Sequence, residues 1–415
     1  MRFTTAVPHG GGANASVADK AAFVERIMAM PNPLVSRLDG YRRWLQHEWS
    51  MWSFHRRSRR NSRRYEAWIR GLQQSPPSVI IGPDLPNGGV RGHLHGILNH
   101  SGLNVQLVPD EVAMGGLEHF TAAIRERFFS FEPPTSTVVH SHVLPWMIRW
   151  CRRQQDRGLR WIHTYHNMYF PEFARGALEP WQLEINEVLL HEARHADVRL
   201  SVSRWQQAYL LTEHGIVTDY LPNGVDVAAC DRGRGASFRR RHKIHCPYIL
   251  YVGRNDPVKN PVDFVRLAHV LPNHVLVMLG QGLDKESLRV EWEVEVPENM
   301  RVLGGATPAM VQDALAGCAV LVVTSLREGL PTLVLEALAH RKPVIVPAEA
   351  GCVEAIGHGD FGAIYQPGEI GELAELTLAA LGDPQPSDKG RQRILAEYDW
   401  RFVARQLDGI YRGTV

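Results

Sequence analysis

Two glutamates, eight positions apart, stand at the ends of the segment EGLPTLVLE, as Glu328 and Glu336. The apolar run 319–323 before them is typical of a parallel strand buried on both faces. Pro331 suits the first turn of a helix, because its missing N–H is not needed there. Open α/β sheets bind ligands beyond the carboxyl ends of their strands. The segment therefore predicts a strand, a turn and a helix whose start lies at a ligand site.

The expected helix has one polar face, because Thr332, Glu336 and His340 are spaced by four residues. Val334, Leu335 and Leu338 lie on its other faces and can pack in a core. The first N–H groups of a helix have no partner within it and suit an anion such as phosphate. Both glutamates could also be ordinary surface residues, since exposed glutamate is common.

Two cations follow another predicted strand at a similar place. Arg254 comes directly after the segment YILYVG, and Lys259 lies five residues further on. Lysine is scarce, with six in the whole chain. The fork of an arginine suits phosphate oxygens and a lysine adds a compact charge, so the pair could stabilise an anionic leaving group such as a diphosphate.

The rest of the chain alternates strand and helix patterns, which predicts two α/β domains with parallel sheets. We expect strands at 79–82, 105–108, 137–140, 160–164, 198–202 and 219–221, and again at 248–252, 275–279, 300–302, 319–323, 343–346 and 363–365. A linker rich in Gly and Arg at 226–242 separates the halves. The predicted organisation is 1–77 a basic extension, 78–228 a first α/β domain, 240–398 a second α/β domain and 399–415 a C-terminal segment. The cleft between the domains is where two substrates would meet.

Composition is that of an ordinary soluble protein, with 44% apolar and 22% charged residues. No apolar run approaches the roughly 20 residues that span a bilayer, and the first residues lack the core of a signal peptide. Five scattered cysteines form no C-x-x-C pair, so neither a disulfide framework nor a zinc site is indicated. A cytoplasmic protein is expected.

Positive charge is concentrated near the start of the chain. Residues 1–76 hold 13 Lys and Arg against 5 Asp and Glu, a balance of +8, and the remaining residues hold 33 against 39, a balance of −6. Segment 41–72 mixes tryptophans with arginines, and three interpretations stay open. It could form helices on the first domain, a peripheral contact with an anionic membrane, or a surface for nucleic acid, which the composition favours least. Residues 2–14 also look like a strand and a glycine loop, so the first domain could begin at Arg2 rather than at Val79.

Five segments in this order resemble retaining nucleotide-sugar glycosyltransferases of the two-domain GT-B type, family 4. They are VIIGPDLPNGGVRGHLHGILNHSGLNVQLV (79–108), YLPNGVD (220–226), ILYVGRNDPVKNP (249–261), REGLPTLVLEAL (327–338) and YDWRFVARQLDGIYR (398–412). Together they extend from about residue 79 to residue 412. The resemblance implies an α/β fold of two facing Rossmann-like halves and a metal-independent transfer of sugar to an acceptor hydroxyl. It also implies that 78–228 is the acceptor domain, that 240–398 is the donor-binding domain and that 399–415 is a helix that crosses back to the first domain.

The resemblance also implies the role of each site residue. Glu336 would bind the ribose of a nucleoside-diphosphate sugar, Glu328 would contact the donor sugar, and Arg254 and Lys259 would hold the diphosphate. Backbone N–H groups would contact the same donor from Gly329, Leu330, Pro331, Thr332 and Leu333. We considered Glu328 as a covalent nucleophile, as in retaining glycosidases. The family is usually explained by front-face substitution instead, in which a leaving phosphate oxygen takes the proton of the acceptor.

Histidines and glycines complete the predicted site. His166 follows the strand 160–164 and matches the family's histidine beside the donor sugar, although Asn167 replaces the usual aspartate. His142 is expected to contact the acceptor. His140 and His142 could suggest a metal, but no nearby carboxylate or cysteine completes a ligand set, so none is predicted. Gly88 and Gly89 would bring backbone close to the diphosphate and acceptor. His93 and His95, which follow them, are expected on the surface of a helix.

The sequence therefore predicts a glycosyltransferase that needs no cofactor, with Glu328, His166, Arg254 and Lys259 as its catalytic residues. Two alternatives stay open. One is an inactive GT-B scaffold that binds a nucleotide or a partner protein, and the other is a GT-B epimerase or phosphorylase, although no pyridoxal lysine site is visible.

Overall fold

The computed structural model describes residues 67–85, 88–109, 132–174, 176–382 and 388–414. The possible start of the first domain at Arg2 and most of the predicted membrane segment 41–72 lie outside these residues. Residues 67–74 are helical, and Leu72 from this helix is buried in the core of the first domain. None of the described helices is both long enough and apolar enough to span a membrane.

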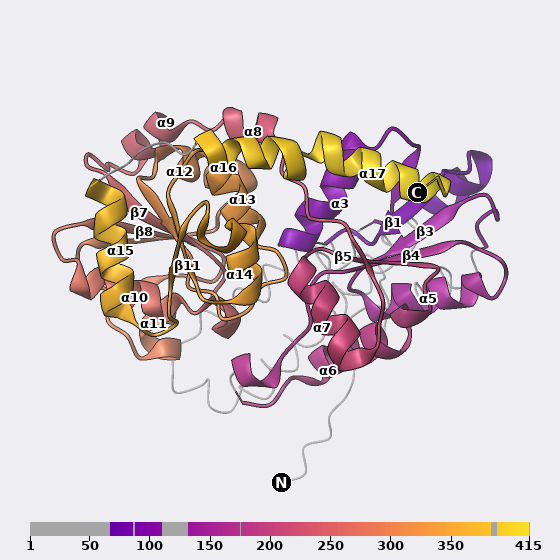
Figure 1. The fold of residues 1–415 in the computed structure, drawn as a ribbon, viewed down its shortest axis with the longest axis horizontal. Coiled ribbons are helices and arrows are strands. Elements are labelled where there is room, and N and C mark those ends of the chain that lie inside the picture. Colours follow the sequence, from indigo (N-terminus) through magenta and orange to yellow (C-terminus); the bar gives the residue numbers. More distant parts are fainter. Residues whose placement is uncertain (1–66, 86–87, 110–131, 175, 383–387, 415) are drawn as a thin grey trace, which may run out of the picture.

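The first domain is a parallel sheet with helices on its faces (Figure 1). Its strands are β1 (Val79–Gly82), β2 (Val105–Leu107), β3 (Val138–Ser141), β4 (Trp161–Tyr165), β5 (Val198–Ser201) and β6 (Asp219–Tyr220). Its helices are α3 (Gly89–His100), α5 (Pro145–Gln155), α6 (Pro180–His191) and α7 (Arg204–His214). The strand order is β2-β1-β3-β4-β5-β6. Strands β1, β3 and β4 are buried along their whole length, as expected for a sheet covered on both faces.

The second domain repeats this plan with another parallel sheet, in the order β12-β11-β10-β7-β8-β9. Its strands are β7 (Tyr248–Val252), β8 (Val275–Gly280), β9 (Met300–Gly304), β10 (Val320–Val322), β11 (Val344–Pro347) and β12 (Ala363–Tyr365). Its helices are α8 (Val227–Asp231), α9 (Gly235–Arg241), α10 (Pro261–Val270), α11 (Lys285–Trp292), α12 (Pro308–Gly317), α13 (Thr332–Ala339), α14 (Ala350–Ala355), α15 (Ile370–Gly382) and α16 (Asp388–Arg393). Every strand predicted from the sequence is present, with ends within about two residues, so the predicted pair of Rossmann-like halves is confirmed.

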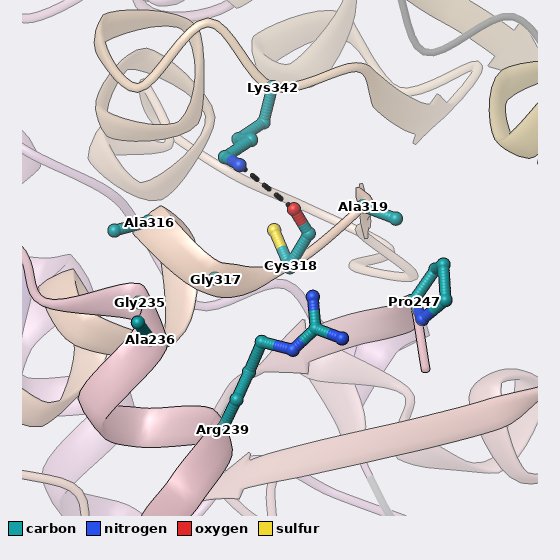
Figure 2. Close-up of a pocket in the computed structure, with 9 residues that line it drawn as sticks. All are labelled: Gly235, Ala236, Arg239, Pro247, Ala316, Gly317, Cys318, Ala319 and Lys342. Carbon is teal, nitrogen blue, oxygen red and sulfur yellow. Dashed lines mark hydrogen bonds between the residues drawn. The ribbon is translucent and has the colours of Figure 1, made fainter. Parts of the chain in front are cut away.

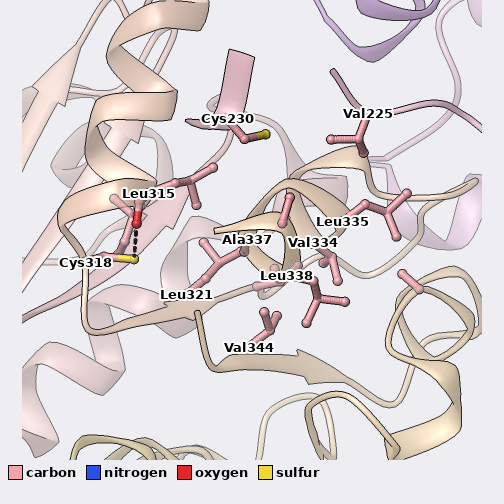
Figure 3. Close-up of a cluster of buried hydrophobic side chains, with 14 of the residues drawn as sticks. Val225, Cys230, Leu315, Cys318, Leu321, Val334, Leu335, Ala337, Leu338 and Val344 are labelled. Atoms are coloured by element: carbon pink, nitrogen blue, oxygen red, sulfur yellow. Dashed lines mark hydrogen bonds between the residues drawn. The ribbon is translucent and has the colours of Figure 1, made fainter. Parts of the chain in front are cut away.

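The core of the second domain forms around α13 (Figure 3). Val334, Leu335 and Leu338 from this helix are fully buried, together with Leu321 of β10 and Val344 of β11. This packing fixes the start of α13 at the carboxyl edge of the sheet. The predicted distribution of apolar residues on this helix is therefore confirmed.

The segment 226–242 is not the open linker that its Gly and Arg content predicts. It forms α8 and α9, which contact α12 and α13. Phe238 on α9 and Ile244 just after it are buried in the core of the second domain. Val227 and Cys230 on α8 are buried in the same core, so apolar side chains on both helices anchor the segment.

The chain passes between the domains twice, and the two passages are hydrogen bonded to each other. The N–H of Val225 donates to the carbonyl of Tyr398 over 2.7 Å, and the N–H of Trp400 donates to the carbonyl of Val225 over 3.1 Å. From Trp400 the last helix, α17 (Trp400–Arg412), runs back across the first domain (Figure 1). Trp400, Val403 and Leu407 are buried there against β1 and α3.

Two glycines make room for Trp400. A Cβ atom on Gly96 of α3 would lie 2.0 Å from the indole ring, and one on Gly224 would lie 2.4 Å from it. We expect Gly96→Ala to destabilise the first domain by about 1–3 kcal/mol, because the Trp400 ring cannot move without displacing α17 from the first domain. Equilibrium unfolding in urea measures this change. Gly92→Ala is the matched control on the same helix, since its Cβ would meet nothing within 4 Å. An equal effect of both substitutions would contradict the packing argument.

Candidate active site

Lys259 and Glu328, predicted from separate motifs, form a direct ion pair. Lys259 ends the short turn Pro257–Lys259 after β7, and Glu328 lies in the loop between β10 and α13. Neither group is freely exposed, since 26% of the Lys259 side chain and 13% of the Glu328 side chain are accessible. The structure therefore joins the predicted cation and the predicted acid in one site.

Contacts between the two loops explain why these side chains meet. The N–H of Leu326 donates to the carbonyl of Val258 over 2.7 Å, and the Thr324 hydroxyl donates to the carbonyl of Asn260 over 2.7 Å. Asn260 has a left-handed backbone, with φ of 43°. Asparagine tolerates this conformation better than most residues, so the turn can be formed without a glycine.

The site lies at the point where the strand order of the second sheet reverses. Strands β7 and β10 are neighbours in the sheet although two further strands separate them in the chain. Their following loops diverge to opposite sides, and this leaves the crevice where open α/β sheets bind ligands. Lys259 and Arg254 follow β7, and Glu328 follows β10.

Arg254 lies on the same loop as Lys259 but is more exposed, with 55% of its side chain accessible. Its Nη2 is 3.2 Å from Oδ2 of Asp256. An exposed pair of this kind contributes little to stability. The guanidinium is therefore available to turn from Asp256 to an anionic ligand.

Glu336 belongs to a separate polar network. Its Oε2 accepts a hydrogen bond of 2.7 Å from Nε2 of Gln312 on α12, and Oε1 of Gln312 is 2.8 Å from Nε2 of His340. Burial raises the pKa of Glu336 to about 7, and burial lowers the pKa of His340 to about 4. None of the described contacts joins Glu336 to Lys259 or Glu328, and its predicted contact with ribose stays a prediction.

The raised pKa of Glu336 has a consequence for stability. Its carboxyl ionises near pH 4.5 when unfolded and near pH 7 when folded, so the folded chain holds the extra proton between these values. The contribution of Glu336 to stability is therefore present below pH 4.5 and lost as the pH rises towards 7. We expect Glu336→Gln to gain stability relative to the wild type across this window, as measured by urea unfolding at several pH values. Glu375→Gln, on the exposed face of α15, is the control, and equal pH profiles for Glu336→Gln and the wild type would contradict the assignment.

The loop before α13 touches the first domain. A Cβ atom on Gly329 would lie 2.1 Å from the backbone carbonyl oxygen of His166, which follows β4. The indole N–H of Trp205 on α7 donates to the carbonyl of Gly329 over 2.7 Å, and Nδ2 of Asn223 donates to the carbonyl of Leu330 over 3.2 Å. Helix α13 begins at Thr332 rather than at Pro331, which occupies the N-cap position. Residues 329–333, the predicted donor-binding backbone, thus lie at the junction of the two domains.

A second contact between the domains was not predicted. The carboxylate of Glu354 on α14 accepts hydrogen bonds from the N–H groups of Arg204 (2.8 Å) and Trp205 (2.9 Å). These are the first N–H groups of α7, so an anion from one domain caps a helix of the other. Arg327 adds to this junction, because its guanidinium lies about 5 Å from the rings of Phe170, Phe173 and Trp205.

Histidines form a buried cluster in the first domain. Nδ1 of His142 lies 3.0 Å from Nε2 of His166, and the ring of His93 packs edge-on against both. Burial lowers the pKa of His93 to about 4, opposed by the nearby Asn223 side chain. Burial and the neighbouring imidazoles hold the pKa values of His142 and His166 well below their usual range. The prediction that His93 lies on the surface of the helix is therefore wrong. The same prediction for His95 holds in part, because His95 is half-buried and its Nε2 lies 3.0 Å from Oδ1 of Asp84.

His140, which the sequence suggested as a possible metal ligand, has a hydrogen-bond partner for each of its ring nitrogens. Nδ1 of His140 is 2.7 Å from the hydroxyl of Tyr411 on α17, and its Nε2 is 2.8 Å from Oγ1 of Thr164. His140 therefore ties the last helix to the first sheet. It is not paired with His142 as a ligand set.

Gly88 and Gly89, both predicted in a loop, differ in backbone conformation and in their place relative to α3. Gly88 has φ of 92°, a left-handed backbone that favours glycine, and it precedes α3. Gly89 is the first residue of α3, and a Cβ on either residue would meet nothing within 4 Å. Their expected contact with the diphosphate stays a prediction.

A shallow pocket of about 360 Å³ lies elsewhere on the second domain (Figure 2). It lies between α9 and the end of α12, with Arg239 and Lys342 on its sides. The Lys342 ammonium donates to the carbonyl of Cys318 over 2.9 Å. None of the predicted site residues lines this pocket, so it is separate from the site at the domain junction.

The facing Rossmann-like halves, the acid and cations at the strand reversal and the helix that crosses back define the GT-B class. Sequence comparison matches residues 116–229 to "Glycosyltransferase Family 4" and residues 237–396 to "Glycosyl transferases group 1". These matches cover both domains, and the chain belongs to the GT-B glycosyltransferases of family 4.

Individual relatives are distant. The chain is 29% identical over 184 residues to the α-maltose-1-phosphate synthase of Mycobacterium tuberculosis, covering 40% of this chain and 48% of that protein. It thus spans about half the length of this relative. It is 27% identical over 336 residues to the D-inositol 3-phosphate glycosyltransferase of Acidothermus cellulolyticus, covering 71% of each chain.

Solved structures with the same fold are more distant still. The sucrose-phosphate synthase of Thermosynechococcus elongatus superposes with a TM-score of 0.65 at 19% identity, over 81% of this chain and 98% of that one. Anabaena HepE in complex with UDP-glucose superposes with a TM-score of 0.63 at 16% identity, over 81% and 99%. At this identity the likeness establishes the fold alone.

Proposed function

We propose that this protein is a metal-independent, configuration-retaining glycosyltransferase that moves a sugar from a nucleoside diphosphate to an acceptor hydroxyl. One observation carries the proposal: Lys259 and Glu328 form an ion pair at the strand reversal of the second sheet. A site for a sugar diphosphate needs a cation for the leaving phosphate and an acceptor for sugar hydroxyls, and this pair supplies both.

The charge that develops on the leaving diphosphate would be met by two side chains. Lys259 is held in place by its ion pair with Glu328, and Arg254 can turn from Asp256 to the phosphate oxygens. The first N–H groups of α13 add fixed dipoles at the same edge of the sheet. These groups supply the electrostatic stabilisation that a divalent cation supplies in other transferases.

Glu328 would position the donor sugar rather than attack it. Its carboxylate is engaged by the Lys259 ammonium, and an ion-paired carboxylate is a weaker nucleophile than a free one. Front-face substitution needs only that donor and acceptor be held together while a phosphate oxygen takes the acceptor's proton. The close approach of Gly329 to the carbonyl of His166 brings the two domains into contact beside this loop, which supports such positioning.

The donor and acceptor can be sought with a small panel. The protein would be incubated with UDP-, GDP- and ADP-sugars and with polyol phosphates, sugar phosphates and glucans, in the presence of a chelator. We expect release of nucleoside diphosphate with one donor, and a product of the donor's own anomeric configuration by NMR. Release that requires a divalent cation, or an inverted product, would overturn the corresponding part of the proposal.

The second candidate is an inactive scaffold that binds a nucleotide or a partner protein. The observation in its favour is that Glu336 binds Gln312 and has a raised pKa, which leaves it less able to accept from a ribose. Calorimetry that shows nucleotide binding, together with no transfer and no donor hydrolysis across the panel, would favour this alternative.

A further inference from the structure

We propose that His93, His142 and His166 form a binding site for a divalent transition metal such as Zn²⁺. Each residue offers one ring nitrogen, and these three atoms lie within 4.8 Å of one another. All three side chains are buried. They come from α3 and from the ends of β3 and β4, so no local sequence pattern contains the set.

The first argument is that the cluster has unused nitrogens. Three buried nitrogens form no hydrogen bond within the described part of the chain: Nδ1 and Nε2 of His93 and Nε2 of His142. Buried polar atoms without partners are rare and call for an explanation such as a missing ion. His140, which lies beside them, has both nitrogens occupied and serves as the contrast.

The second argument is chemical. Neutral imidazole suits Zn²⁺, and three histidines with an open fourth position are an established ligand set for this ion. Zn–N bonds of about 2.0–2.1 Å place tetrahedral ligand atoms roughly 3.3 Å apart, so the cluster must contract by up to about 1.5 Å.

A partner for the outer nitrogen of His93 is also present. Metal-bound histidines usually donate their other N–H to an oxygen, which fixes the ring. Oδ1 of Asn223 is buried without a hydrogen bond in the described structure, and this side chain lies close enough to His93 to influence its pKa. One nitrogen of His93 can thus bind the metal while the other donates to Asn223.

The site would act against transfer rather than for it. This consequence rests on the proposed function, in which His166 lies beside the donor sugar. A metal bound to its imidazole would engage the side chain that would contact the sugar, so the ion would compete with the substrates.

Cobalt titration of the full chain, freed of metal by a chelator, tests binding without any need for activity. We expect one Co²⁺ per chain with the visible absorption of a four- or five-coordinate ion, displaced by Zn²⁺. His93→Gln should weaken Co²⁺ binding by at least about 10-fold. Loss of a residue that only hydrogen bonds to a metal ligand costs about 10–100-fold, and loss of a ligand should cost no less. His95→Gln, two residues along α3 and half-buried, is the matched control and should bind normally.

Zn²⁺ should also raise the melting temperature of the wild type and of His95→Gln but not of His93→Gln. If His93→Gln does not fold, His142→Gln replaces it in both measurements. Absence of binding by the wild type, or unchanged binding by either folded variant, overturns the site and leaves the cluster as packing. Failure to find a sugar donor leaves these measurements unaffected.

Discussion

Replacement of Lys259 by alanine is expected to lower kcat/KM by roughly 10²–10³-fold, the range for loss of one preorganised electrostatic group. Lys259 is the one lysine that contacts a predicted acidic site residue within the described structure. Its loss removes a cation from the leaving diphosphate and leaves the partly buried Glu328 without its counterion. The measurement is steady-state kinetics with the donor found in the panel.

Two further substitutions separate charge from position. Lys259→Arg keeps the charge but replaces a compact ammonium with a planar fork, so it should recover part of the lost rate. Lys285→Ala removes an exposed lysine from α11 in the same domain and should leave the rate unchanged. If Lys259→Ala transfers sugar as fast as Lys285→Ala, the ion pair has no part in catalysis.

The sequence predicted the architecture well because the signals for it are local. Strand β10 is a continuous apolar run, and α13 carries its buried residues Val334, Leu335 and Leu338 at helical spacing. The position of Lys259 and Glu328 at one edge of the sheet also followed, since parallel strands bring their carboxyl ends together, but their direct ion pair was not predicted.

The sequence could not predict contacts that depend on how distant elements pack. Gln312 reaches Glu336 from α12, and Glu354 caps α7 from the other domain. Each is a common polar residue on an ordinary helix, with no motif around it. His93 did carry a signal, because it shares a helix face with the buried Ile97, four residues on.

The second large effect is expected from Gly329→Ala. A methyl group there would lie 2.1 Å from the carbonyl oxygen of His166, a backbone atom that cannot turn aside. The loop 326–331 or the end of β4 must therefore move. Gly351 leaves little room beside the loop, because a Cβ atom there would lie only 2.5 Å from the carbonyl oxygen of Glu328. We therefore expect the clash to be relieved by a separation of the two domains.

Such a separation would pull Glu328 away from His166 and break the hydrogen bond between Trp205 and Gly329. A misplacement of about 1 Å can cost about 10²-fold in rate, so we expect a loss of this size in kcat. Small-angle scattering should show a larger radius of gyration than that of the wild type.

The matched control for this change is Gly371→Ala on α15, where a Cβ would meet nothing within 4 Å. Gly371→Ala should keep the wild-type kcat and the wild-type radius of gyration. Because the clash at Gly329 lies between domains and not within a core, urea unfolding of the second domain should change much less than the rate. A Gly329→Ala protein with wild-type kcat would mean that transfer does not require the observed approach of the two domains.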